Sequence, residues 1–315
     1  MSIRLKLSSL AAGVALALAA AAPAHAVPLI GLTTTNSIVR FDSASPLLGS
    51  AEVAVTGLRG DDRLLGIDLR PSTGLLYGVS SGNNLYTIDA NTGVASFVAM
   101  LSTALLGASF GIDFNPVPDN TSTGPNSLRI VSDTGQNLRV QVNASGGTTA
   151  VGNAAVDTSL NGATTRLDGV AYTNNDRDPA TGTVLYGIDA ESNALYSFAS
   201  PNTGTNQRVG SLGGPGFDVT AVLGFDIFGA SSAFAALVLG GSGDAKTGIY
   251  SIDLVSGAAS FLGNYGIGGL TSRASQLQGL TVAVTPVPEP ETYALMLAVL
   301  GALGFMSRRK KRQGS

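Results

Sequence analysis

The sequence predicts an all-β protein, a β-propeller with five blades, and three observations support this. Residues 64–97 read as four short strands separated by turns rich in glycine, proline and asparagine. A glycine followed by an apolar residue opens this unit and returns at positions 66, 111, 169, 224 and 279. Between the two ends of the chain there is no helical pattern of useful length. Because one four-stranded unit cannot bury both faces of its own sheet, the repeats must pack on each other.

The chain starts with a segment typical of a secretory signal peptide, residues 1–26. Arg4 and Lys6 precede an apolar run, and Ala24 and Ala26 flank His25 as a small-x-small cleavage site. We expect cleavage before Val27, so that the folded protein is exported; an uncleaved membrane anchor is the alternative.

The strands follow in order within residues 27–285, the predicted propeller domain. Two strand-like runs open it, and the template unit then has strands at residues 66–69, 75–80, 85–89 and 94–99. Related strands are expected at residues 128–132, 137–142, 184–189, 194–199 and 249–253. The spacings of 45, 58, 55 and 55 residues between the glycines indicate one repeated unit with loops of variable length.

A final glycine-led strand, Gly279–Val284, stands alone just before the C-terminal tail. We expect it to complete a fifth sheet with the strands between Leu29 and Leu58, because sharing one blade between both ends removes exposed edges. A six-bladed ring and an open array of β-sandwiches are the alternatives.

Composition excludes several kinds of chemistry. The chain has no cysteine, and its single histidine, His25, lies in the leader. The mature chain therefore cannot form a Ser–His–Asp triad, a Cys–His pair or a His-ligated metal site. Residues 27–285 carry 11 basic and 19 acidic side chains, a net charge of −8, which argues against nucleic acid as a partner.

Three aspartates, Asp68, Asp113 and Asp226, each follow the Gly-apolar pair, while Ala171 and Thr281 occupy the equivalent positions in the other repeats. If these strands are innermost, the carboxylates converge on the central channel. Three carboxylates could bind Ca²⁺ there. The favoured interpretation is instead that each aspartate accepts hydrogen bonds from a neighbouring turn and ties one blade to the next. No catalytic residue and no required cofactor is identified.

A second polar cluster contains Arg129 and Arg139, with Asn137 between them, on predicted strands. These arginines either pair with carboxylates of the domain, which is favoured, or bind an anionic ligand. Further polar side chains follow inner strands and are expected at one mouth of the channel: Asn115, Tyr172, Asn174 and Asn175.

The tail, residues 286–315, has three parts. Pro288-Glu289-Pro290 is followed by an apolar stretch at residues 292–306 and by a basic cluster that begins with Arg308 and Arg309. Fifteen helical residues span about 22 Å, short of the roughly 30 Å of a bilayer core, so this stretch is a marginal, transient membrane anchor. The tail closely resembles the PEP-CTERM sorting signal of Gram-negative bacteria. That resemblance implies processing by an exosortase and delivery to the cell surface or exterior, often in organisms that produce polysaccharide.

The region between resembles a bacterial family of exported domains of unknown function, through GIDLRPSTGLLYG, GIDFNP, RIVSDTGQNLRV, AYTNN, PNTG and VGSLG. The resemblance implies a secreted, propeller-like protein and supplies no catalytic residues. We therefore expect a binding module of the surface or extracellular matrix, with the exosortase, the secretion machinery and an extracellular polysaccharide or surface component as partners. The alternatives are a secreted hydrolase or lyase that uses channel carboxylates, and a structural matrix component without a discrete ligand.

Overall fold

The computed structural model describes residues 26–119, 127–143, 150–176, 178, 180–240 and 246–283. These residues belong to the first of two units, Met1–Ala283, and the second unit, Val284–Ser315, lies outside them. The first 25 residues, with most of the expected signal peptide, also lie outside, as do the tail residues Pro288, Glu289, Pro290, Arg308 and Arg309. In the part of the chain that the structure describes, no helix has the length and apolar character needed to cross a membrane.

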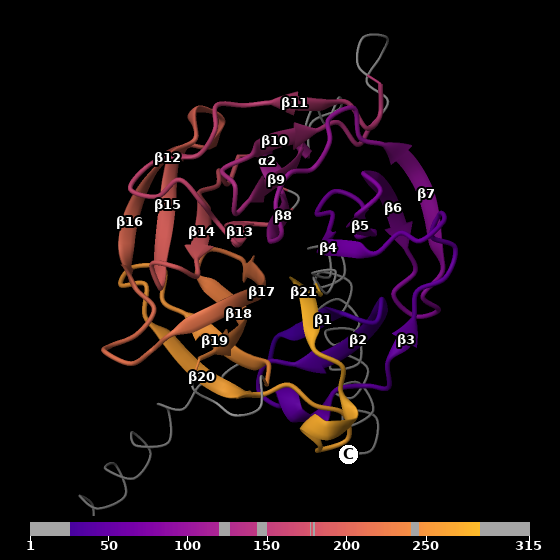
Figure 1. Cartoon of the computed structure of the whole chain (residues 1–315), viewed down its shortest axis with the longest axis vertical. Coiled ribbons are helices and arrows are strands. Elements are labelled where there is room, and N and C mark those ends of the chain that lie inside the picture. The colour runs from indigo at the N-terminus through magenta and orange to yellow at the C-terminus, as the bar shows by residue number, and fades with distance from the viewer. Residues whose placement is uncertain are drawn as a thin grey trace, which may run out of the picture. The chain divides into compact units, whose positions relative to one another are not determined.

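Five small sheets, antiparallel except for one short strand, surround a common axis (Figure 1). We name four of them blades 1 to 4 in chain order. The fifth is built from both ends of the domain, and we name it the closing blade.

Blade 1 contains β4 (Leu64–Leu69), β5 (Leu76–Ser80), β6 (Asn84–Ile88) and β7 (Ala95–Met100). Blade 2 contains β8 (Phe110–Phe114), β9 (Leu128–Ser132), β10 (Asn137–Val140) and β11 (Ala154–Val156). Blade 3 contains β13 (Gly169–Tyr172), β14 (Leu185–Asp189), β15 (Ala194–Ser200), β16 (Thr205–Ser211) and the short β12 (Asn161–Gly162). Blade 4 contains β17 (Val219–Phe228), β18 (Ser232–Leu239), β19 (Gly248–Ile252) and β20 (Ala259–Asn264).

The closing blade contains β21 (Leu277–Val282), β1 (Pro28–Thr33), β2 (Ser37–Asp42) and β3 (Val53–Ala54). Its inner strand comes from the C-terminal end of the domain and pairs antiparallel with β1, Leu29 opposite Val282. The inner strands contact each other in the order β21, β4, β8, β13, β17 and back to β21 (Figure 1). The five-bladed propeller with a shared last blade is thereby confirmed, and the open array and the six-bladed ring are not what the chain forms.

The glycines that open the inner strands are required by close approach between blades. A Cβ atom on Gly66 would lie 2.7 Å from Cδ1 of Ile112, and one on Gly111 would lie 2.5 Å from the backbone nitrogen of Val170. On Gly224 it would lie 2.4 Å from the backbone nitrogen of Leu280. These separations are far below van der Waals contact, so a larger residue would push neighbouring inner strands apart.

The apolar core lies between the faces of neighbouring blades. One buried cluster joins blades 1 and 2 through Tyr77, Leu85, Phe114 and Ile130. Comparable clusters join blades 3 and 4, and blade 4 and the closing blade. Alternating strand residues thus bury both faces of each sheet, as the repeat pattern predicts.

The helices are short and lie in connections: η1 (Pro46–Leu48), α2 (Pro116–Asp119), η2 (Pro201–Thr203) and η3 (Thr271–Arg273). Helix α2 follows the inner strand of blade 2 and carries Asp119, which is buried. Blade 3 differs from the repeat because β12 adds a fifth strand parallel to β16, Asn161 opposite Thr205.

Candidate functional site

The three inner-strand aspartates converge, and we call Asp68, Asp113 and Asp226 the axial carboxyl cluster. One carboxylate oxygen of each lies within 4.8 Å of the others, and all three side chains are buried. Among the described residues this is the one group of three acidic, His or Cys side chains that gathers so closely. The aspartates are brought together because each occupies the third position of the Gly-apolar repeat on an inner strand.

Each aspartate of the cluster also ties its blade to the next one. Asp68 accepts a hydrogen bond from the backbone N–H of Phe114 at 2.7 Å, and Asp113 accepts one from Tyr172 at 3.0 Å. Asp226 accepts one from Val282 at 2.6 Å. In each pair, the donor follows the equivalent position of the neighbouring repeat by one residue.

Thr281 continues this ring of ties, and Ala171 interrupts it. The Thr281 hydroxyl oxygen accepts a hydrogen bond from the backbone N–H of Leu69 at 3.2 Å, which joins the closing blade to blade 1. Ala171 has no side-chain acceptor, and at the next blade the backbone N–H of Ile227 donates instead to its neighbour Asp226 at 2.6 Å. Within the described residues, the boundary between blades 3 and 4 therefore lacks the tie that the other four boundaries have.

The axial carboxyl cluster favours protonated carboxyls. The Thr281 hydroxyl lies 2.9 Å from Oδ1 of Asp68 and 2.9 Å from Oδ2 of Asp226. A hydroxyl carries one proton, so a proton on one of these two carboxyls would complete both contacts. Burial, followed by the negative charge of Asp226, raises the pKa of Asp68 well above its usual range. Burial also raises the pKa of Asp113 well above that range and raises the pKa of Asp226 to about 6.

The fit of the cluster to Ca²⁺ is poor. A calcium ion takes about six to eight oxygen ligands, whereas the cluster supplies three carboxyls whose oxygens already accept backbone N–H groups. Just before the aspartates on the same strands lies a cavity of about 20 Å³, lined by residues that include Gly66, Ile112 and Phe225. That volume has room for about one water molecule. The cluster is therefore suited to holding blades together and offers no space for a substrate.

A second group of predicted residues comes together at the boundary of blades 2 and 3. We call it the arginine pocket: a cavity of about 260 Å³ lined by Asn115, Ser127, Arg129, Arg139, Tyr172 and Asn202, with Pro118 at its edge. Arg129 on β9 and Arg139 on β10 are directly opposite each other in the sheet, so their side chains share one face. Tyr172 reaches the pocket from the end of β13 in the neighbouring blade.

Arg129 is held rigidly, and its side chain is only 2% exposed. Its Nη1 donates to Asn137 at 2.6 Å and to Asp157 at 2.8 Å. Its Nη2 donates to Asn202 at 2.6 Å, and its Nε donates to the Tyr172 hydroxyl at 3.2 Å. Burial raises the pKa of Tyr172, so its phenol stays neutral.

Arg139 is partly exposed and pairs with the same carboxylate. Its Nε and Nη2 donate to the two oxygens of Asp157, each at 2.7 Å. This bidentate bond raises the pKa of Arg139, which keeps its positive charge. Both arginines therefore pair with a carboxylate of the domain, which is the interpretation that the sequence favours. Because the two guanidinium groups share the single carboxylate of Asp157, one positive charge is not neutralised.

Asn174 and Asn175 lie elsewhere. Asn174 donates its backbone N–H to the carbonyl of Gly229 at 2.7 Å, and its side-chain nitrogen donates to Gly182 at 3.1 Å. Asn175 accepts the backbone N–H of Gly229 at 3.2 Å. Both therefore fix a loop of blade 3 against a turn of blade 4, and the structure does not bring them to the arginine pocket.

Three polar residues at the pocket escape sequence reasoning: Ser127 and Asn202, which line it, and Asp157, which pairs with both arginines. Asn202 belongs to the Pro-Asn-Thr-Gly turn, which the sequence marks only as a turn. The sequence offers one indication that an acidic residue lies nearby, which is the arginine pair itself. Two arginines on neighbouring strands require a carboxylate or another hydrogen-bond acceptor. A buried ion pair nearby was also missed: Asp119 accepts from Nε of Arg70 at 2.7 Å and from the Ser127 hydroxyl at 3.1 Å.

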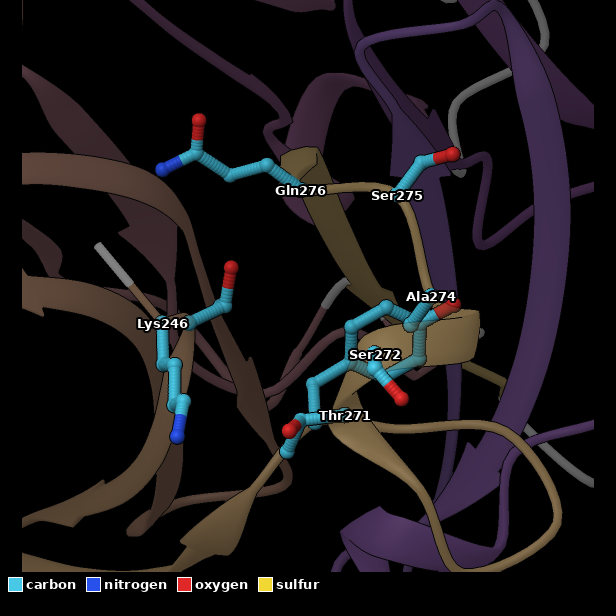
Figure 2. Close-up of a pocket in the computed structure, with 8 residues that line it drawn as sticks. Lys246, Thr271, Ser272, Ala274, Ser275 and Gln276 are labelled. Atoms are coloured by element: carbon cyan, nitrogen blue, oxygen red, sulfur yellow. The ribbon is translucent and has the colours of Figure 1, made fainter. Parts of the chain in front are cut away.

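A further cleft, of about 400 Å³, lies between blade 4 and the closing blade. Figure 2 shows Lys246 on one side of this cleft and Thr271 and Ser272 on the other, with Gln276 and Ser275 above them in the view. Lys246 and Gln276 are exposed. Since no buried charge lines it, this cleft is less pre-organised than the arginine pocket.

Comparison with known proteins gives two family matches. A family profile described as a domain of unknown function, DUF4394, matches residues 37–277, and one described as the PEP-CTERM protein-sorting motif matches residues 286–311. No curated protein matches the chain.

Several solved structures are similar at low identity. A chain of a nidogen/laminin complex is 12% identical with a TM-score of 0.44, covering 82% of this chain and 85% of that one. A protein of unknown function from Bacteroides caccae is 10% identical with a TM-score of 0.45, covering 82% and 98%. One from Bacteroides thetaiotaomicron is 12% identical with a TM-score of 0.46, covering 74% and 56%. Similarity at this level says nothing about ligands.

Proposed function

The chain belongs to the DUF4394 family and carries the PEP-CTERM sorting motif of exported, exosortase-processed proteins, and from this premise we propose that its propeller is a binding module of the cell surface or extracellular matrix. The single observation that supports a binding role best is the arginine pocket. Its buried guanidinium is fixed by four hydrogen bonds, which is the pre-organisation that a binding site needs.

The alternative of a hydrolase or lyase at the channel has weaker support. The three carboxyls that would perform the chemistry are buried, accept backbone hydrogen bonds, and adjoin a cavity of only about 20 Å³. General acid–base catalysis needs a group within hydrogen-bond reach of a substrate. A substrate could reach the axial carboxyl cluster only after the blades separated.

The delivery route that we propose has three segments. Residues 1–26 direct export and are removed after Ala26; residues 27–285 fold as the propeller; residues 286–315 anchor the chain transiently through 292–306 until the exosortase cuts near Pro288–Pro290. The basic residues after the apolar stretch stay on the cytoplasmic side.

Binding of the mature protein to surface material tests this function. Protein recovered from the medium of an exosortase-positive Gram-negative host is mixed with extracellular polymer from the same culture, and co-sedimentation is measured. Saturable binding is expected, and an unrelated secreted protein of similar charge serves as the control. If the mature protein remains in the supernatant at every polymer concentration, the binding role is wrong.

A further inference from the structure

The arginine pocket carries one more positive charge than its protein partners neutralise. Arg129 and Arg139 share the carboxylate of Asp157. The other nearby acidic groups do not offset the excess. Asp119 is paired with Arg70, and Asp113 belongs to the axial carboxyl cluster and does not line the pocket.

The excess charge lies beside the buried guanidinium of Arg129, while the Arg139 side chain is 31% exposed and can be reached by an anion. The domain as a whole is acidic, with a net charge of −8 over residues 27–285, so the pocket is a local positive site on a negative protein. A polyanion is repelled by the rest of the surface and is attracted only where its charged group can enter the pocket. The excess of one charge matches a monoanion.

Both arginines have N–H donors left to bind such a monoanion. Arg129 has five N–H groups, four of which donate to the protein. Nη1 of Arg139 has no acceptor among the described residues, whereas its Nε and Nη2 hold Asp157. Arginine donors form paired, planar hydrogen bonds with a carboxylate.

The rest of the lining is suited to hydroxyl groups. The side-chain amides of Asn115 and Asn202, the Ser127 hydroxyl and the Tyr172 phenol combine donors and acceptors around the two arginines. At about 260 Å³ the cavity is slightly smaller than the roughly 300–1,000 Å³ of pockets that enclose drug-sized ligands. It therefore fits one sugar-sized unit.

We infer that the arginine pocket binds the carboxylate of a uronic-acid unit in an acidic polysaccharide, between Arg139 and the fixed guanidinium of Arg129. This inference rests on the proposed binding function and names its ligand class. The carboxylate neutralises the excess charge, and the asparagine, serine and tyrosine side chains hydrogen-bond the ring hydroxyls.

The experiment uses the mature protein and two probes, oligogalacturonate and the same oligosaccharide with its carboxyl groups reduced to alcohols. Binding is measured by isothermal titration calorimetry. The Arg139→Gln variant removes the excess charge but leaves the Arg129–Asp157 pair in place, so its fold is expected to survive, and circular dichroism verifies this. The matched control is Arg208→Gln, which removes an exposed arginine on β16.

Oligogalacturonate is expected to bind, the reduced oligosaccharide to bind at least tenfold more weakly, and Arg139→Gln to lose at least tenfold in affinity while Arg208→Gln is unchanged. Free galacturonate tests whether a single uronic-acid unit is enough for binding, and a sulfated dextran tests whether a sulfate group can replace the carboxylate. The inference is overturned if the reduced oligosaccharide or the sulfated dextran binds as well as oligogalacturonate, if none of the acidic probes binds, or if Arg139→Gln binds normally. If the mature protein still co-sediments with the native polymer in any of these cases, the proposed binding function stands and only this pocket and this ligand class are rejected.

Discussion

Replacing Asp113 by asparagine tests whether protons hold the axial carboxyl cluster together. The side-chain amide of the Asp113→Asn variant keeps an oxygen to accept the backbone N–H of Tyr172 and places a permanent N–H where the protonated carboxyl of Asp113 has its O–H. The variant therefore imitates the protonated state of Asp113 at every pH. At pH 4 we expect its free energy of unfolding to match that of the wild type.

The sign and size of the effect follow from proton linkage. A carboxyl whose pKa is raised in the folded state binds its proton more tightly there than in the unfolded chain, so its stabilising contribution is complete below about pH 4 and is lost as pH rises through the folded pKa. The rise in the pKa of Asp226 from 3.8 to about 6 corresponds to about 3 kcal/mol. Wild-type stability should fall by about this amount between pH 4 and pH 7, apart from other groups, and Asp113→Asn, which removes one of the coupled carboxyls, should lessen that fall.

Urea unfolding followed by far-UV circular dichroism, at four pH values from 4.0 to 7.5, measures this difference. Subtracting the wild-type curve from the variant curve cancels carboxylates elsewhere, and Asp61→Asn, which changes an exposed aspartate, serves as the control. The reasoning is refuted if the difference between Asp113→Asn and wild type does not change with pH. It is also refuted if Ca²⁺ stabilises the wild type at pH 7 and a chelator reverses this, because a cation would then replace the protons.

Three further outcomes are expected. Gly111→Ala should lower the free energy of unfolding by about 1–3 kcal/mol in urea titrations, because its Cβ meets the neighbouring inner strand, and Gly214→Ala, whose Cβ has open space, should change it little. Asp119→Asn should cost about 3–5 kcal/mol in the same titrations, since it leaves the guanidinium of Arg70 buried without its partner; a cost under about 1 kcal/mol would contradict this. Deleting Pro288–Pro290 should retain the protein at the inner membrane in cell fractionation, and unchanged release would reject the sorting assignment.

The ring of five blades was predictable from the sequence because a glycine at a recurring position marks the inner strand of each blade. Gly66 and its four equivalents mark the inner strands, and an unpaired final strand next to the tail leaves the first strands of the domain as its one available partner. The convergence of the three aspartates follows from the same repeat, because equivalent positions on inner strands face one axis. Local pattern and global fold agree at these positions.

The arginine pocket was predictable only in part. Arg129 and Arg139 fall on strands, and strand pairing explains why they meet. Asp157 and Asn202 approach them from connections whose paths depend on how two blades pack, and no local pattern encodes such paths. Asn174 illustrates the same limit: its place after an inner strand does not reveal that its backbone N–H donates to Gly229 of the neighbouring blade.

Sharing a blade between the two ends of the domain sets the order of events during export. On the proposed export route, β21 emerges after nearly all of the domain, so β1 should keep an open edge until about 250 residues have emerged. Joining segments so far apart costs about 5 kcal/mol in chain entropy, which the finished seam must exceed. Protease protection of β1 should therefore appear only once β21, which ends four residues before the sorting motif, has emerged.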